Sequence, residues 1–132
     1  MAKTPLSKKL RIQPGHRVLI MNAPPGYLDE LGALPEGVNV AEKPEGIFDF
    51  VHLFVKSVAE LERLGPAAIE AIKPDGLLWI SYPKRSSKVD TDITRDVGWD
   101  VVTQAGLRAV FQVSINDVWS ALRFRPADRV GK

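Results

Sequence analysis

The sequence predicts an α/β fold in which a mostly parallel sheet is covered by helices on both faces. Four apolar runs of strand length alternate with segments that have the apolar spacing of helices, which is the order that produces parallel strand pairs. Two further strand-like runs end the chain, separated by Asn116 and Asp117. A two-residue connection favours a hairpin, so the last strand is expected to be antiparallel.

The composition fits one small domain. The chain has 132 residues, of which 45% are hydrophobic and 26% are charged, and domains are most often about 100–150 residues long. We therefore expect one α/β domain over residues 1–125, followed by a basic C-terminal tail over residues 126–132.

Charge and residue types argue against several classes of function. The 18 Lys and Arg residues against 16 Asp and Glu give a net charge of +2, too small an excess to predict nucleic-acid binding. With no cysteine, and with His16 and His52 as the two histidines, neither a disulfide nor a metal site is expected. No apolar run has the length of a membrane helix or of a signal peptide, so we expect a cytoplasmic protein.

The first half of the chain predicts a strand-helix-strand unit after a short leading helix. Thr4 and Pro5 have the pattern of a helix cap followed by proline at the first helical position. The elements expected here are a helix over 6–12, a strand over 17–22, a stiff loop over 23–26, a helix over 27–34 and a strand over 38–41.

The middle of the chain predicts the centre of the sheet. Residues 48–55 are the most aromatic and β-branched stretch, which favours a central strand. Ser57 and Glu60 have the spacing of a capping box, and an apolar stripe continues behind them to Ile72. We expect Pro66 to kink or restart this helix. Residues 73–76 should stop the helix, and residues 77–82 should form the fourth strand.

The last third predicts one helix and the hairpin. Apolar residues recur at helical spacing over residues 91–105, and Gly106 has the position of a left-handed C-cap. Residues 107–115 and 118–124 are the two strands of the hairpin. Trp99 falls outside the apolar stripe of its predicted helix, so it either marks the surface of a homo-oligomer or packs against Arg95 or a neighbouring loop.

Three segments in this order carry a resemblance to a known fold. They are Val18-Leu19-Ile20-Met21 in the first strand, Phe48-Asp49-Phe50-Val51 in the central strand, and Lys73-Pro74-Asp75-Gly76-Leu77-Leu78-Trp79-Ile80 after a helix. With the closing hairpin, the chain resembles the Rossmann-like fold of class I S-adenosylmethionine-dependent methyltransferases. Within that fold it is most similar to a small uncharacterised bacterial family of short, single-domain proteins. The resemblance implies the sheet order 2-1-3-4-6-5, with strand 6 antiparallel and one edge strand and its helix missing.

The loop after the first strand departs from the methyltransferase pattern. The resemblance implies an acidic residue and a loop of the form D/E-x-G-x-G-x-G at this place, where the backbone approaches the cofactor closely. The sequence has Asn22-Ala23-Pro24-Pro25-Gly26 instead. The two prolines supply no N–H groups and fix φ where backbone donors are wanted. We therefore expect that the protein does not transfer methyl groups.

The candidate binding residues follow from the predicted topology, because ligands of open α/β sheets bind at the carboxyl ends of the strands. They are Asn22, Gly26, Tyr27, Glu42, Lys84, Arg85, Ser86 and Trp119. Glu42 has the place of an acid that binds ribose hydroxyls in such folds, or it is a solvated surface acid. Lys84, Arg85 and Ser86 precede the helix predicted from Thr91, so they either bind a phosphate or carboxylate at its N-terminus or form a solvated loop.

No catalytic residue is predicted. His52 alternates with apolar residues and is expected to be a half-buried histidine with its hydrogen bonds satisfied. Neither histidine has a serine or carboxylate partner at a recognisable spacing. Our preferred hypothesis is a non-catalytic binding or interaction module that holds an anionic or nucleotide-like ligand and needs no cofactor. The alternative is a degenerate S-adenosylmethionine-dependent enzyme in which Asn22, Gly26 and Glu42 hold the cofactor.

Overall fold

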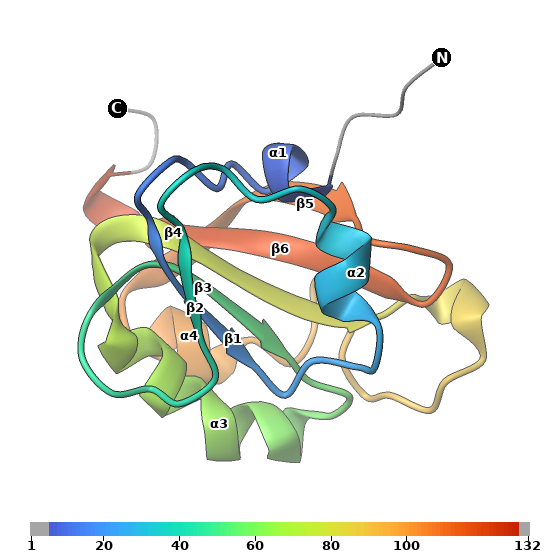
Figure 1. The fold of residues 1–132 in the computed structure, drawn as a ribbon. Coiled ribbons are helices and arrows are strands. Elements are labelled where there is room, and N and C mark those ends of the chain that lie inside the picture. Colours follow the sequence, from blue (N-terminus) through green and yellow to red (C-terminus); the bar gives the residue numbers. More distant parts are fainter. Residues whose placement is uncertain (1–5, 130–132) are drawn as a thin grey trace.

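A six-stranded mixed sheet forms the centre of the computed structural model, which describes residues 6–129. The sheet order is β2-β1-β3-β4-β6-β5, and β6 is antiparallel to both β4 and β5 (Figure 1). The strands are β1 (Arg17–Met21), β2 (Asn39–Ala41), β3 (Phe48–Phe54), β4 (Ile72–Pro83), β5 (Leu107–Ser114) and β6 (Trp119–Pro126). The predicted order and the reversed strand are both confirmed.

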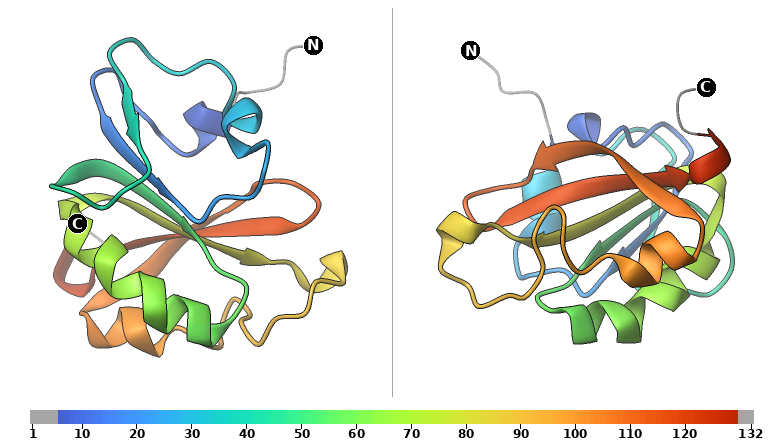
Figure 2. Two further views of the ribbon diagram at one scale, coloured as in Figure 1. Left: turned by 60° about the horizontal axis from the view of Figure 1, so that its bottom comes forward. Right: turned by 180° about the vertical axis from the view of Figure 1, so that it is seen from behind.

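Helices cover both faces of the sheet, as predicted (Figure 2). One face carries α3 (Val58–Ala71) and α4 (Asp100–Gln104), and the opposite face carries α1 (Leu6–Lys9) and α2 (Tyr27–Leu31). The 3-10 turns η1 (Arg85–Ser87) and η2 (Ala127–Arg129) complete the elements. Thr4 and Pro5, which were expected to cap α1, lie outside the described residues. Within residues 6–129, no helix is both long and apolar enough to cross a membrane.

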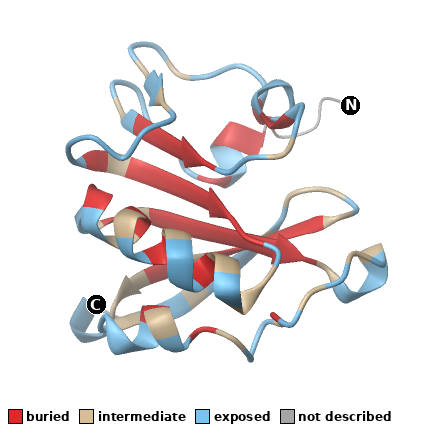
Figure 3. Cartoon of the chain, turned by 90° about the horizontal axis from the view of Figure 1, so that it is seen from below, coloured by how far each residue is buried: buried red, intermediate tan, exposed pale blue. Residues whose placement is uncertain are grey.

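The alternation of side chains along β3 produces two separate cores. Val51 and Leu53 pack toward α3, whereas Phe50 and Phe54 pack toward α1 and α2. All four side chains are inaccessible to solvent, as expected for a central strand buried on both faces (Figure 3). The central strands of the sheet are therefore fixed by packing on both faces, and they position the loops that follow their ends.

The capping box at the start of α3 forms with a one-residue offset. The Ser57 Oγ accepts a hydrogen bond from the Glu60 backbone N–H at 3.1 Å, and the Glu60 carboxylate accepts one from the Lys56 backbone N–H at 2.7 Å. The helix runs without interruption through Pro66, so the proline does not restart it.

The segment predicted to stop α3 becomes part of the sheet. α3 ends at Ala71, and β4 begins at Ile72, so the strand is longer than the predicted residues 77–82. Ile72 pairs with Phe48 and Leu77 pairs with Phe50, which leaves residues 73–76 as a bulge. Asp75 in this bulge has φ of 54°.

The predicted helix over residues 91–105 is wrong for its first nine residues, because α4 begins only at Asp100. Thr91 and Thr94 accept hydrogen bonds from backbone N–H groups two or three residues ahead, and such bonds compete with a helix. Gly98, with φ of 104°, turns the chain into α4. Gly106 has φ of 85°, which confirms the predicted left-handed conformation after the helix.

Trp99 is a core residue. It is 7% exposed, its ring lies 5.6 Å from that of Tyr82 and 5.2 Å from that of Phe124, and its indole N–H donates to the Thr94 carbonyl at 2.8 Å. Of the two alternatives, packing is therefore correct, and the loop that Trp99 contacts contains Thr94. Trp99 lends no support to the predicted homo-oligomer.

Several other boundaries differ from the prediction. α1 ends at Lys9 instead of residue 12, and β6 continues to Pro126 instead of residue 124. α2 ends at Leu31 instead of residue 34, because Gly32 has φ of 78° and leaves the helix. The hairpin loop contains residues 115–118 instead of two residues. The Asn116 side-chain oxygen accepts hydrogen bonds from the Val118 and Trp119 backbone N–H groups, both at 2.9 Å, and this Asx turn sets the longer loop.

Candidate ligand-binding site

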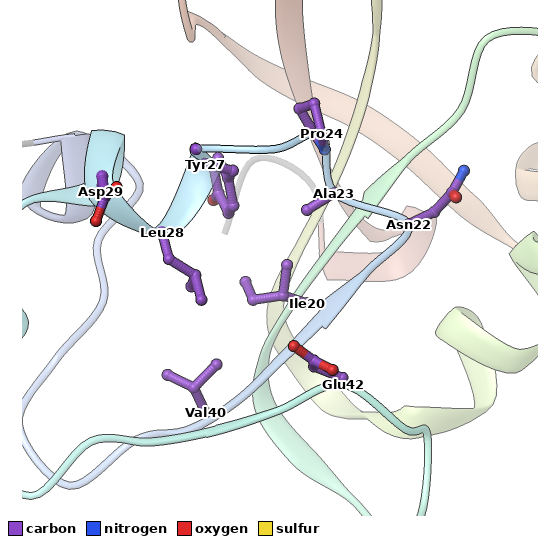
Figure 4. A pocket seen from close by; sticks show the side chains of 10 residues that line it. Ile20, Asn22, Ala23, Pro24, Tyr27, Leu28, Asp29, Val40 and Glu42 are labelled. Carbon is purple, nitrogen blue, oxygen red and sulfur yellow. The ribbon is translucent and has the colours of Figure 1, made fainter.

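A cavity of about 630 Å³ lies where β1 and β2 end beside α2 (Figure 4). We refer to it as the carboxyl-edge cavity. It is lined by Ile20, Asn22, Ala23, Pro24, Gly26, Tyr27, Leu28, Asp29, Val40 and Glu42. Open α/β sheets bind ligands outside the carboxyl ends of their strands, and the cavity lies at this edge of the sheet, beside β1 and β2.

The loop from β1 to α2 forms a fixed wall of this cavity. Asn22 has φ of 60°, and its amide donates a hydrogen bond to the Phe54 carbonyl at 2.8 Å, which ties the loop to the end of β3. Its side chain points away from the cavity (Figure 4). Gly26 has φ of 84°, and an added Cβ would meet no atom within 4 Å. Glycine is therefore favoured here by the backbone conformation and not by a lack of space.

The loop offers few backbone donors. Pro24 and Pro25 have no N–H group, and the Tyr27 N–H is already directed at the Pro24 carbonyl at 3.3 Å. A glycine-rich loop of a methyltransferase presents free N–H groups to an anionic part of the cofactor. The present loop lacks that capacity at both prolines.

Acidic and apolar groups dominate the remaining walls. Leu28 on α2 and Val40 on β2 are 51% and 37% exposed, respectively, and they face each other across the cavity in Figure 4. Glu42 follows β2, and its carboxylate is turned toward this space, while Asp29 lies at the far end on α2. No lysine or arginine is among the described lining residues, so the cavity disfavours anions.

Tyr27 is hydrogen bonded to a buried histidine of β3. Its hydroxyl is hydrogen bonded to His52 Nδ1, and His52 Nε2 is 2.6 Å from the Ser81 hydroxyl oxygen. His52 and Ser81 are inaccessible to solvent, and Tyr27 is 1% exposed. His52 was expected to be half-buried, and it is instead completely enclosed with both ring nitrogens satisfied.

Burial determines the protonation of this network. It lowers the pKa of His52 to about 3, because an imidazolium is poorly solvated there. Burial also raises the pKa of Tyr27, with a smaller contribution from the charge of Glu30. The ring is therefore neutral at ordinary pH and can donate through one nitrogen and accept through the other. The hydrogen bond from Tyr27 to this serine-histidine pair holds α2 on the sheet. Because Ser81 is inaccessible to solvent, its hydroxyl cannot reach a substrate as a nucleophile.

The basic loop lies outside the carboxyl-edge cavity. Lys84 Nζ donates to the Ser114 hydroxyl at 2.6 Å, and Arg85 and Ser86 form part of η1. None of these three residues lines the cavity that contains Glu42. The helix N-terminus expected at Thr91 does not exist, so the physical basis for an anion site in this loop is removed.

Trp119 and Asn22 meet at a neighbouring cavity of about 350 Å³, which shares Asn22, Ala23 and Pro24 with the first. Trp119 is only 6% exposed, and its ring packs edge-on against Phe54 at 5.1 Å. The structure thus brings Gly26, Tyr27 and Glu42 together, puts Asn22 and Trp119 beside them, and places the basic loop elsewhere. Leu28, Asp29 and Val40 were missed, since nothing in their spacing distinguishes them from other surface residues.

Comparison with known proteins identifies similar solved structures but no protein family. No protein-family model matches the sequence, and no curated protein matches it. A solved possible exported protein from Bordetella parapertussis matches with a TM-score of 0.58 and 13% identity, over 92% of this chain and 66% of that one, just under two thirds. The ribosomal protein L11 methylase of Lactobacillus delbrueckii matches with a TM-score of 0.57 and 10% identity, over 92% and 74%.

A third similar structure contains a ligand. The N-methyltransferase NodS of Bradyrhizobium japonicum, solved with S-adenosyl-L-homocysteine, has a TM-score of 0.53 and 14% identity, with 91% of this chain and 85% of that one covered. At such identities the likeness establishes the architecture alone. The chain has the Rossmann-like fold of class I S-adenosylmethionine-dependent methyltransferases.

Proposed function

We propose that the chain is a non-catalytic binding module that holds an uncharged or positively charged, nucleoside-like ligand in the carboxyl-edge cavity. The observation that carries the proposal is the pairing of Glu42 with the apolar wall of Leu28 and Val40. A carboxylate accepts hydrogen bonds from vicinal hydroxyls, and branched aliphatic side chains pack well against a planar base.

The charge of the cavity restricts the ligand. Glu42 and Asp29 are both on its walls without a cation among the described lining residues, so a phosphate placed there would be repelled. The sequence led us to expect an anionic or nucleotide-like ligand. The acidic walls restrict this expectation to a nucleoside-like ligand without a phosphate group.

S-Adenosylmethionine fits this cavity only in part. Its adenosine half has the same groups as the proposed ligand, whereas its carboxylate would meet Pro24, which has no N–H group, and the acids of the walls. His52 is enclosed and cannot reach a ligand in the cavity, so it does not serve as a general base there. These mismatches support binding without methyl transfer.

The competing function is an S-adenosylmethionine-dependent methyltransferase, which the architecture supports as well. Under that function Asn22, Gly26 and Glu42 would hold the cofactor. The orientation of Asn22, whose amide is bound to the Phe54 carbonyl, disfavours it.

Titration of ¹⁵N-labelled protein with adenosine, adenosine monophosphate and S-adenosylmethionine separates these functions. We expect adenosine to shift the resonances of residues 26–29 and 40–42, and the monophosphate to shift them more weakly. Glu42→Gln should weaken adenosine binding by about tenfold, the effect of losing one charged hydrogen-bond acceptor. Glu62→Gln, which removes an exposed acid of α3 outside the cavity, is the matched control.

Three results would overturn the proposal: no shift with adenosine, tighter binding of the monophosphate through the same resonances, or methyl transfer from S-adenosylmethionine to any acceptor. The last result would establish the competing function.

A further inference from the structure

Arg11 and Arg123 form a second basic feature, at the edge of the sheet opposite to the carboxyl-edge cavity. A groove of about 260 Å³ lies there against the beginnings of β3 and β4. We refer to it as the arginine groove. The charged side chains that line it are Arg11, Asp49, Lys73, Asp75 and Arg123, and His16 lies beside them.

Arg123 is held between aromatic residues of the neighbouring strands. It pairs with Trp79 on β4 and with Phe111 on β5, and the rings of Trp79 and Phe111 are 6.5 Å apart. Its Nε is buried and has no hydrogen-bond partner. A buried donor without an acceptor is rare in proteins, and an anion in the groove is one partner that could satisfy it.

Arg11 is fixed above the same face. The Trp79 indole N–H donates to the Leu10 carbonyl at 3.0 Å, which clamps the chain next to Arg11. The Arg11 guanidinium lies over the Phe111 ring, 5.5 Å from its centroid. Arg11 has φ of 69°, the left-handed conformation that ends α1, where the Arg11 and Ile12 N–H groups donate to the Lys8 and Ser7 carbonyls, both at 3.0 Å.

The carboxylates of the groove are already paired. Asp49 accepts hydrogen bonds from the Arg17 backbone N–H at 2.8 Å and from Lys73 Nζ at 2.9 Å. Asp75 accepts two from Arg125, at 2.8 and 2.9 Å. Within residues 6–129, neither Arg11 nor Arg123 has a carboxylate partner within salt-bridge distance.

The two guanidiniums therefore repel each other, and the groove compensates for this only in part. Burial, followed by the charges of Arg11 and Arg125, lowers the pKa of Arg123, and the charge of Asp75 opposes this. An anion placed between the two arginines would relieve the repulsion and accept their hydrogen bonds. The planar fork of guanidinium is suited to phosphate oxygens.

We propose that the arginine groove binds a phosphate group through Arg11 and Arg123, with Phe111 as the positioning residue for Arg11. The site is separate from the carboxyl-edge cavity and does not depend on the function proposed for it. Its ligand is either free phosphate or the phosphate of an ester, since the groove opens to solvent beside the exposed Phe111 ring.

Calorimetric titration with inorganic phosphate, and separately with glycerol 3-phosphate, tests the proposal at an ionic strength kept constant with sodium chloride. We expect binding of at least one of them. Arg11→Gln and Arg123→Gln should each weaken it by about tenfold or more, as expected for loss of a charge-assisted hydrogen bond. Binding of phosphate alone, or tighter binding of it, would identify the free ion, and tighter binding of glycerol 3-phosphate would identify an ester.

Two further variants separate a built site from general attraction to positive charge. Arg85→Gln removes a cation of η1, outside the groove, and should leave phosphate affinity unchanged. Phe111→Ala keeps both arginines but removes the support of Arg11, so affinity should fall without loss of either charge. Because Arg11 and Phe111 are exposed, these variants keep the test valid if Arg123→Gln fails to fold. Absence of binding by both probes, or equal weakening by Arg85→Gln, would overturn the proposal.

Discussion

The hydroxyl of Tyr27 is hydrogen bonded to Nδ1 of His52, and this contact joins α2 to the central strand of the sheet. The two residues are 25 positions apart in the sequence. The ring of His52 also stacks on that of Phe54, with centroids 4.2 Å apart. The wall of the carboxyl-edge cavity is thus fixed from inside the protein.

Tyr27→Phe should lower the free energy of unfolding by about 1–3 kcal/mol, because it leaves a buried ring nitrogen of His52 without a partner. Urea denaturation measures the change. Tyr82→Phe is the matched control. The Tyr82 hydroxyl accepts a long hydrogen bond of 3.2 Å from the Gln112 amide, and this amide keeps its bond to Ser120 when the hydroxyl is removed. Equal effects of the two substitutions would contradict the assigned role of the Tyr27 hydroxyl.

Stability should fall as the pH is lowered from about 7 to about 4. The pKa of His52 is lowered to about 3 in the folded protein, against about 6.5 in an unfolded chain. The unfolded state therefore binds one more proton than the folded state between these values, and the slope approaches ~1.4 kcal/mol per pH unit. Urea denaturation of the His16→Gln variant between about pH 7 and about pH 5 measures the contribution of His52, since the other histidine is removed and the carboxylates of an unfolded chain titrate only at about pH 4. A free energy of unfolding that does not change with pH over this window would disagree with a neutral, enclosed His52.

Trp99→Ala should destabilise the fold by about 3–5 kcal/mol, the range for removing a large aromatic side chain from a core. Its neighbour Val97 is 58% exposed, so Val97→Ala should change stability by less than about 0.5 kcal/mol. Thermal unfolding compares the two, and light scattering records the mass. A change in mass with little change in stability would instead indicate that Trp99 lies at an interface between copies.

Gly98→Ala should be more destabilising than Gly106→Ala, although both glycines have positive φ. An added Cβ at Gly98 would lie 3.0 Å from Val58 Cγ2, whereas at Gly106 it would meet nothing within 4 Å. Both changes carry backbone strain of about 1 kcal/mol, and only the first adds a clash with α3. Denaturation midpoints of the two variants provide the measurement. The reverse order would show that α3 yields easily at Val58.

The architecture could be predicted because it depends on local composition. Strands such as β3 are continuous apolar runs, and their order along the chain restricts the sheet to few topologies. The helix predicted from Thr91 failed for an equally local reason. Ile93 and Val97 have helical spacing, yet Ile93 is buried and Val97 is exposed. The hydroxyls of Thr91 and Thr94 accept hydrogen bonds from nearby N–H groups, and such bonds compete with a helix.

The candidate site could be predicted only where it depends on strand ends. Gly26 and Glu42 were found because each follows a predicted strand, and the topology brings those ends together. The contact of His52 with Ser81 and the groove between Arg11 and Arg123 depend on pairs 29 and 112 residues apart. Neither pair has a spacing that a sequence pattern could reveal. The register of the sheet brings His52 beside Ser81, and the packing of the segment after α1 on β4 brings Arg11 to Arg123.

The two prolines of the loop after β1 have a consequence for how a ligand would be selected. Pro24 and Pro25 have fixed φ angles, and the amide of Asn22 holds the loop to β3. Such a wall is already ordered before a ligand arrives, so association loses little conformational entropy there. The same rigidity prevents the loop from closing around molecules of different shape. Discrimination at this edge would then come from size and charge in a preformed recess, with rapid exchange of whatever enters it.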